Sequence, residues 1–239
     1  VDSDDWIEPD MYEFLYHLLK ENGADISICS HYRDKGKKSV AKYSSGEQFV
    51  FTRDEGIRAL VVDRRIRNYV WDKLYKRRLF SGITFPLNRI FEDIAISYRI
   101  FYKAEKIVVR EFPKYHYVIR DGSAMQSKYD PLKEHNLFLS VYEQVYFVLE
   151  KGIWDQAPIY VLRRGIRLID HMSMLRPSSS TEGVIKDVLA KMHEFDDVSC
   201  CQLGLSLSLK RYFIFHYMSA YRKTYRFVRL ILKSKRHKF

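Results

Sequence analysis

Three absences limit what this chain of 239 residues can be. It has only three cysteines, and Cys200 and Cys201 are adjacent, so it lacks the spacing of a disulfide framework or a zinc site. Such use of cysteine is typical of a reducing compartment. The acidic first residues lack the basic and then apolar pattern of a signal peptide. No apolar run approaches the ~18 residues that span a bilayer, so the sequence predicts a soluble or peripheral protein.

Acidic residues are also missing from the end of the chain. Residues 205–239 contain ten lysines and arginines and no aspartate or glutamate. The other 204 residues hold 31 bases and 30 acids, so the net charge of +11 belongs almost entirely to this tail. A near-neutral body with a basic tail does not favour a protein that binds nucleic acid over its surface. We therefore expect no nucleic-acid partner.

Hydrophobic residues make up 46% of the chain, which suffices for one sizeable core. In the front half, periodicity predicts helices after Glu8-Pro9-Asp10 and from Glu92-Asp93, and strands at 24–29, 106–109 and 115–119. Residues 33–45 favour a loop or a loose hairpin. Helical patterns dominate from Asp130-Pro131 onward, with a linker at 176–180. The sequence thus predicts an α/β part at residues 1–128, a helical region at 129–204 and a basic amphipathic helix at 205–239.

Two groups of acids are candidates for chemistry. Asp2 and Asp4 are two residues apart, so on an extended segment both carboxylates can face a divalent cation, although aspartate-rich stretches are commonly helix caps or solvated turns. Glu92 and Asp93 stand at an expected helix start, where acids commonly complement the helix dipole. A carboxylate there can also act as a general base, and we expect the dipole to keep Asp93 ionised.

A third group follows the acids. His116 lies between two tyrosines and is a possible metal ligand, although a histidine in that setting is more often packed on a strand. Arg120 can clamp diphosphate oxygens, and Ser123 in the following loop can add a hydrogen bond.

The order of these motifs is more specific than any one of them. The series comprises Asp2-Ser3-Asp4-Asp5-Trp6, Trp71-Asp72-Lys73-Leu74-Tyr75-Lys76-Arg77, Phe85-Pro86 before Phe91-Glu92-Asp93, and Tyr115 to Ser123. Over residues 1–125 it resembles the family 2 glycosyltransferases of the A-type fold, which build bacterial capsule, exopolysaccharide, lipopolysaccharide or teichoic-acid decorations. The resemblance implies the C-terminal half of a Rossmann-like catalytic domain followed by a mostly helical region.

The same resemblance implies an inverting transfer of sugar from a nucleotide-sugar, UDP-linked, to a hydroxyl of a glycan or lipid-linked acceptor. Asp4 would ligate Mg²⁺ or Mn²⁺, with His116 as a further ligand in some relatives. Asp2 would lie near the ribose or diphosphate, and Arg120 and Ser123 would close over the diphosphate. Asp93 would be the catalytic base, supported by Glu92.

The family places a nucleotide-binding βαβ region before the acidic motif, and this chain begins at the motif itself. Because each βαβ unit takes ~30 residues, we expect roughly a hundred residues of such a domain to be missing. A catalytically incomplete fragment that docks on a membrane or on a partner is therefore the alternative function.

The basic tail favours a membrane contact. An apolar, aromatic-rich stripe is expected at Ile214, Tyr217, Met218, Tyr221, Tyr225, Val228 and Leu232. Most of the bases lie off this stripe, which suits the interface of an anionic membrane, although a helix packed on the body with a solvated basic face is the other possibility. We expect a cytoplasmic protein, peripheral on the inner face of the plasma membrane.

Overall fold

The computed structural model describes residues 1–87, 89–120 and 130–236 of the chain, which forms two units, Val1–Tyr129 and Asp130–Phe239. Unit 1 is mixed α/β, and the described part of unit 2 is helical, as the sequence predicts.

Unit 1 is built on a sheet with the order β1-β6-β2-β3, in which β4 also pairs with β6 and β5 with β2. Its described strands are β1 (Trp6–Ile7), β2 (Ile26–Lys35), β3 (Lys38–Lys42), β4 (Gln48–Thr52), β5 (Lys73–Tyr75) and β6 (Lys106–Val118). Strands β2 and β6 run parallel, and the other pairs are antiparallel. Both central strands carry runs of buried residues, as expected for a sheet covered on both faces.

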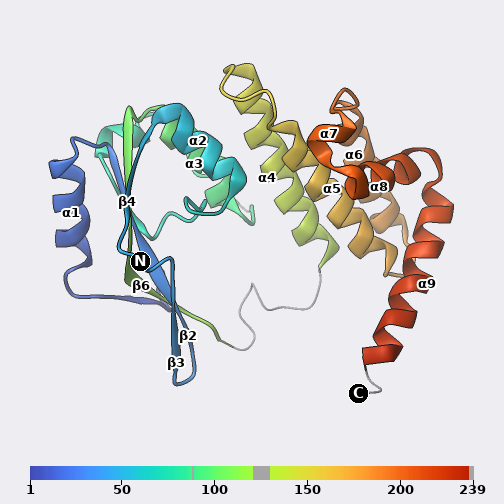
Figure 1. Ribbon diagram of the computed structural model, residues 1–239, viewed down its shortest axis with the longest axis horizontal. Coiled ribbons are helices and arrows are strands. Elements are labelled where there is room, and N and C mark those ends of the chain that lie inside the picture. Colours follow the sequence, from blue (N-terminus) through green and yellow to red (C-terminus); the bar gives the residue numbers. More distant parts are fainter. Residues whose placement is uncertain (88, 121–129, 237–239) are drawn as a thin grey trace. The chain divides into compact units, whose positions relative to one another are not determined.

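Helices cover both faces of this sheet (Figure 1). Helix α1 (Met11–Glu21) lies on one face, while α2 (Arg53–Val62) and α3 (Glu92–Tyr102) lie on the other. Met11 and Leu15 of α1 pack with Cys29 and Tyr115 in one buried cluster. A short 3₁₀ turn, η1 (Arg77–Phe80), follows β5. This packing positions the end of β6, to which the acidic segment 2–5 is bonded, and the start of α3, where Glu92 and Asp93 lie.

The structure decides one open expectation in unit 1 and corrects two others. Of the loop or loose hairpin expected at 33–45, the hairpin is confirmed, because β2 continues to Lys35 and pairs with β3. The two strands expected at 106–109 and 115–119 are one strand, β6. Helix α2 was not predicted, although its capping box, in which Thr52 and Glu55 bond to each other's backbone N–H, is a readable signal.

Unit 2 is organised around α5 (Pro158–Ser173), most of whose residues are buried. The other helices described are α4 (Pro131–Glu150), α6 (Ser179–His193), α7 (Cys200–Leu203), α8 (Leu205–His216) and α9 (Met218–Arg236). The expected linker at 176–180 is shorter than predicted, because Ser178 caps α6 by accepting a hydrogen bond from the Thr181 N–H. None of the described helices combines the length and hydrophobicity needed to cross a bilayer.

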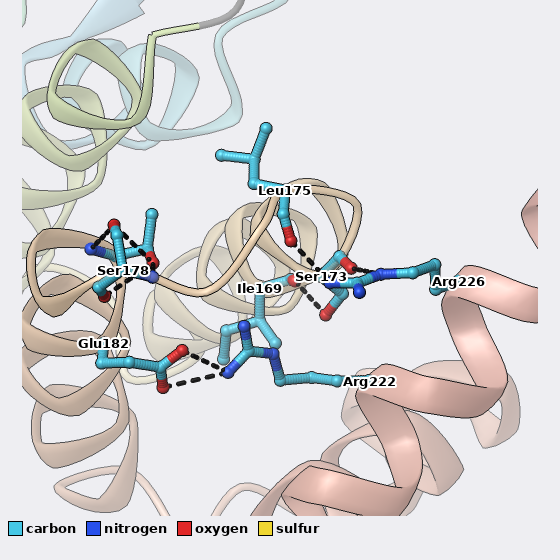
Figure 2. Close-up of polar contacts among 8 residues, drawn as sticks. Ile169, Ser173, Leu175, Ser178, Glu182, Arg222 and Arg226 are labelled. Atoms are coloured by element: carbon cyan, nitrogen blue, oxygen red, sulfur yellow. Dashed lines mark hydrogen bonds and ion pairs between the residues drawn. The ribbon is translucent and has the colours of Figure 1, made fainter.

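The tail is two helices instead of the one expected, because the chain leaves helical geometry at Tyr217. Helix α9 is held against the body by polar contacts (Figure 2). Arg222 Nη1 lies 2.7 and 3.0 Å from the two carboxylate oxygens of Glu182. Arg226 donates to the carbonyls of Ser173 (2.9 Å) and Leu175 (2.5 Å) just where α5 ends, a position that favours a cation.

Two glycines of unit 2 give a matched stability test. A methyl group at Gly165 would lie 2.4 Å from Sδ of the buried Met192, whereas one at Gly183 meets nothing within 4 Å. We expect Gly165→Ala to lower the free energy of unfolding by about 1–3 kcal/mol through overpacking. Gly183→Ala should raise the free energy of unfolding by about 0.5–1 kcal/mol, because glycine inside a helix loses more conformational freedom on folding than alanine does. Denaturant unfolding measures both, and equal effects would contradict the packing described for α5 and α6.

Candidate active site

Asp5 holds the acidic segment 2–5 against the end of β6. Its Oδ1 accepts a hydrogen bond from the Val118 N–H, and its Oδ2 accepts one from the Tyr115 hydroxyl, both at 2.8 Å. The Tyr115 hydroxyl accepts in turn from the Asp2 N–H at 3.2 Å. Strand β1 continues the attachment by pairing Trp6 with His116. Sequence reasoning gave Asp5 no role, because its partners lie more than 100 residues away.

The charges of this segment are poorly neutralised. Partial desolvation raises the pKa of Asp2, whose side chain is still exposed; the negative charges of Asp5, Asp4 and Glu92 raise it further, and the N-terminal amine lowers it. The Asp4 side chain is exposed and makes no hydrogen bond or ion pair within the described residues. Glu92 thus lies close enough to act on Asp2 electrostatically, although 90 residues separate them. The structure therefore brings the two predicted acid groups into one region.

Glu92 and Asp93 begin α3, as predicted. The residue before them, Phe91, has φ 65° and ψ 40°, a left-handed conformation that is strained for a bulky residue. Asp93 Oδ1 accepts a hydrogen bond from the Ile94 N–H at 2.8 Å. Strained backbone of this kind is found preferentially at functional sites.

Asp93 is less acidic than the helix dipole alone would make it. Burial raises its pKa to about 6, opposed by the bond from the Ile94 N–H and the charge of Lys73 and supported by the charges of Glu92 and Asp63. Burial thus outweighs the helix dipole in setting this pKa, and the expectation that Asp93 is ionised at neutral pH stays a prediction. At pH 7 the carboxylate is still mostly ionised, and its pKa suits a general base near neutral pH.

A buried ion pair between Lys73 and Asp72 lies near enough to Asp93 for the charge of Lys73 to lower the pKa of Asp93. The ammonium of Lys73 is fully buried and donates to the Asp72 carboxylate and to the Tyr69 carbonyl. Burial raises the pKa of the Tyr75 hydroxyl, and the charges of Asp72 and Asp93 raise it further. Lys73 matched a family position in the sequence, but its burial was not predicted.

His116 is surrounded on every side. Its ring stacks between Trp6 and Tyr32, with centroid distances of 3.4 and 4.4 Å. Nδ1 lies 2.9 Å from a carboxylate oxygen of Asp34, and Nε2 lies 3.0 Å from one of Glu8. Each contact suits an N–H donor, so ligation of a metal would require one to break. Its assignment as a metal ligand stays a prediction, and these contacts favour a structural role.

Arg120 lies beside the acids, since its Nη2 donates to the Asp4 carbonyl at 2.9 Å. Ser123 falls outside the described residues. Of the seven predicted site residues, the contacts and charges therefore connect Asp2, Asp4, Glu92, Asp93 and Arg120 in one region, with His116 one residue from Tyr115.

A divalent cation fits the aspartates only in part. No group of three or more His, Cys, Asp or Glu side chains within the described residues is arranged to hold a metal ion. Mg²⁺, however, commonly takes one or two carboxylates and fills its other positions with water and phosphate oxygens. The negative charges of Asp5, Asp4 and Glu92 all act on Asp2, and a cation bound there would relieve this repulsion. The donor set is thus compatible with a cation shared with a phosphate ligand.

Comparison with known proteins agrees with this geometry. No protein-family model matches the chain. Two proteins of Streptococcus pneumoniae are similar to it: glycosyltransferase GlyA, 30% identical over 131 residues, and glycosyltransferase GlyG, 30% identical over 140 residues. These matches cover 52% and 54% of this chain, but 19% of GlyA and 46% of GlyG. The chain therefore spans less than half the length of these curated relatives.

The structure is similar to that of Staphylococcus aureus TarS, residues 1–349, solved in complex with UDP-GlcNAc. The TM-score is 0.61 at 18% sequence identity, and the match covers all of this chain and 67% of that chain. At this identity the likeness concerns the fold. The chain has a glycosyltransferase fold.

The contacts of Asp5 separate its role from that of Asp4. We expect Asp5→Ala to lower the free energy of unfolding by about 1–3 kcal/mol, because it leaves a tyrosine hydroxyl and a backbone N–H without their charged acceptor. Asp4→Ala should change stability by less than about 0.5 kcal/mol, since its side chain is exposed and unbonded within the described residues. Thermal unfolding of both variants tests this assignment, and a larger loss in Asp4→Ala would overturn it.

Proposed function

We propose that this chain forms part of an inverting glycosyltransferase that moves a sugar from a nucleotide-sugar, UDP-linked, to a hydroxyl of a glycan or lipid-linked acceptor in cell-surface polysaccharide synthesis. One observation carries the proposal: the charge of Glu92, at the start of α3, acts on Asp2 of the acidic segment within a glycosyltransferase fold. The UDP-GlcNAc bound to TarS supports a nucleotide-sugar donor.

Asp93 is the general base of the proposed reaction. Its carboxylate takes the proton of the acceptor hydroxyl as the oxygen attacks the anomeric carbon from the side opposite the leaving diphosphate, and configuration inverts. A base in position contributes roughly 10²–10⁴-fold to the rate. Glu92 raises the pKa of Asp93 through its charge and so supports the base without taking the proton.

We assign the binding of the leaving diphosphate to the acidic segment and Arg120. Asp4, with Asp2 beside it, would hold Mg²⁺ or Mn²⁺, which when bound supplies positive charge to a departing diphosphate. Arg120 is anchored to the Asp4 carbonyl, so its guanidinium stands where it can also contact phosphate oxygens. Ser123 is assigned to the same loop by the sequence alone.

A peripheral membrane location on the cytoplasmic face belongs to the same proposal, with a revised contact surface. The structure turns Met218, Tyr221 and Tyr225 of the expected stripe towards the body, while Phe227, Val228, Ile231 and Leu232 of α9 stay exposed. Lys223 and Arg229 are exposed among these apolar residues. An apolar surface with bases beside it suits an anionic bilayer.

The pH dependence of Asp93→Asn tests the enzymatic proposal. In the intact gene product, kcat/KM of the parent should rise with pH through about 6 and then level, because Asp93 is a base only when ionised. Asp93→Asn should lower turnover by roughly 10² or more and lose this limb, with donor binding nearly intact. Glu92→Gln should reduce turnover less.

Stability supplies the control for this experiment. Because folding raises the pKa of Asp93 from 3.8 to about 6, ionisation of this group lowers the free energy of unfolding as the pH rises between these two values, and the loss is complete at pH 7.5. Asp93→Asn should therefore not destabilise the protein at that pH. Near-normal turnover in a folded Asp93→Asn protein would end the case for Asp93 as the base.

Vesicle binding tests the tail surface. Deleting 205–239 would uncover α5, so charge reversal is the cleaner change. We expect Lys223→Glu with Arg229→Glu to release the protein from phosphatidylglycerol vesicles, because each base contributes about 1 kcal/mol at an anionic surface. Arg167→Glu with Lys186→Glu reverses as many exposed charges elsewhere in unit 2 and should leave co-sedimentation unchanged. Equal loss in the two variants would show that only net charge matters.

A further inference from the structure

The β2–β3 hairpin has two chemically different faces. Residues directly opposite in an antiparallel pair share a face, and residues two apart along a strand share it too. The register pairs His31 with Lys42, Arg33 with Val40 and Lys35 with Lys38. One face therefore carries Arg33, Lys35, Lys38 and Lys42, which we call the hairpin track. The other face carries Tyr32 and Asp34, both in contact with His116.

The positive charge of the hairpin track is not neutralised. None of its four side chains makes a hydrogen bond or an ion pair with a residue that the structure describes. The acid of the hairpin, Asp34, is on the opposite face, where it accepts from Ser39 and contacts His116. Arg33, Lys35 and Lys38 are exposed and Lys42 is half-buried, so an anionic ligand can reach them.

The charges of the hairpin track act on the pKa values of two neighbouring side chains, His31 and Tyr117. Burial lowers the pKa of His31 to about 4, and the charges of Arg67, Arg33, Lys73 and Lys42 lower it further. Arg33 also acts on Tyr117, to which β2 pairs it across the parallel ladder. Burial and these four cations together keep His31 neutral; Arg67 and Lys73 are paired with Asp63 and Asp72, whereas Arg33 and Lys42 have no such partner within the described residues.

The hairpin track leads to the candidate active site. Tyr117 responds to the charges of Asp5 and Asp4 as well as to that of Arg33, so it stands between the acids and the track. Arg67 lies at the inner end, since its Nη2 donates to the Tyr69 hydroxyl at 3.2 Å and Tyr69 lies beside His31, but its charge is shared with the Asp63 carboxylate 3.3 Å away. Its buried Nε has no hydrogen-bond partner within the described residues.

We propose that the hairpin track binds a linear acceptor that carries repeated negative charges, phosphate or carboxylate, and guides its end towards Asp93. Bases at alternate positions of a strand lie roughly 7 Å apart, so one extended face can contact several charges of a chain in turn. The identification of the ligand as an acceptor rests on the proposed glycosyl transfer. Binding itself does not depend on transfer.

Hydrogen–deuterium exchange locates this binding on the 239-residue chain and separates it from binding to the basic tail. The probes are an oligoguluronate, which supplies carboxylates, a linear polyphosphate, and a neutral dextran oligosaccharide. We expect at least one charged probe to protect the amides of residues 33–42, and dextran not to. Arg33→Gln/Lys35→Gln/Lys38→Gln should raise the half-protecting concentration about ten-fold or more, because three charge contacts are lost.

The matched control is Lys20→Gln/Arg64→Gln/Arg110→Gln, which removes three exposed charges from other parts of unit 1. It should change the half-protecting concentration less than about two-fold. Protection by only one charged probe identifies the anion. Absence of protection, equal weakening in the two variants, or stronger protection by duplex DNA or anionic vesicles would each overturn the proposal. An inactive parent with a protected hairpin would instead count against glycosyl transfer alone.

Discussion

The position of the candidate site depends on the two hydrogen bonds that Asp5 accepts. Residues 1–4 are exposed and contribute little apolar contact, so polar bonds must hold them. A carboxylate that accepts from both a buried tyrosine hydroxyl and a backbone N–H forms charge-assisted bonds, which are stronger than neutral ones. Tyr115 belongs to the core cluster with Met11 and Leu15, so the hydrogen bonds of Asp5 attach the acidic segment to the core and not to a loop. Any movement of β6 would therefore move Asp2 and Asp4 with it.

The acids of the site differ from other partly buried acids of unit 1 in having no adequate cation. Burial alone would raise the pKa of Asp25, but a bond from the Glu105 N–H and the partners Lys76 and Arg78 lower it below its usual value. Glu111 behaves likewise beside Ser45 and Arg65. The pKa values of Asp2 and Asp93 are raised instead, because desolvation outweighs the groups that stabilise their charged forms and the negative charges nearby add to its effect. An acid whose pKa is raised in this way can be stabilised by a bound cation or by a proton. Acids with shifted pKa values are therefore common at functional sites.

Local sequence signals predicted the elements that are locally encoded. The start of α3 at Glu92 and the start of α4 after Asp130-Pro131 follow from acids, proline and apolar spacing that act within one or two turns. The continuity of β6 could not be read locally, since Glu111 and Lys114 interrupt the apolar pattern, and their partners Arg65 and Asp10 are distant in the sequence. The same holds for His116, whose partners Glu8 and Asp34 come from two other strands or loops. Long-range partners thus decided what local patterns left open.

Charge counts face the same limit, because a base matters to a ligand only if no acid has already bound it. The tail has ten bases, yet Lys210 is paired with Asp170, Arg222 with Glu182 and Arg226 with two carbonyls. These contacts fasten α8 and α9 to α5 and α6, so three of the ten bases stabilise unit 2. The hairpin track differs: its four bases lie in residues 33–42, where Asp34 is the one acid, and the described residues leave them unpaired because the register places Asp34 on the other face. Binding surfaces therefore follow from where the fold leaves charge unmatched, which a count of charges along the sequence does not give.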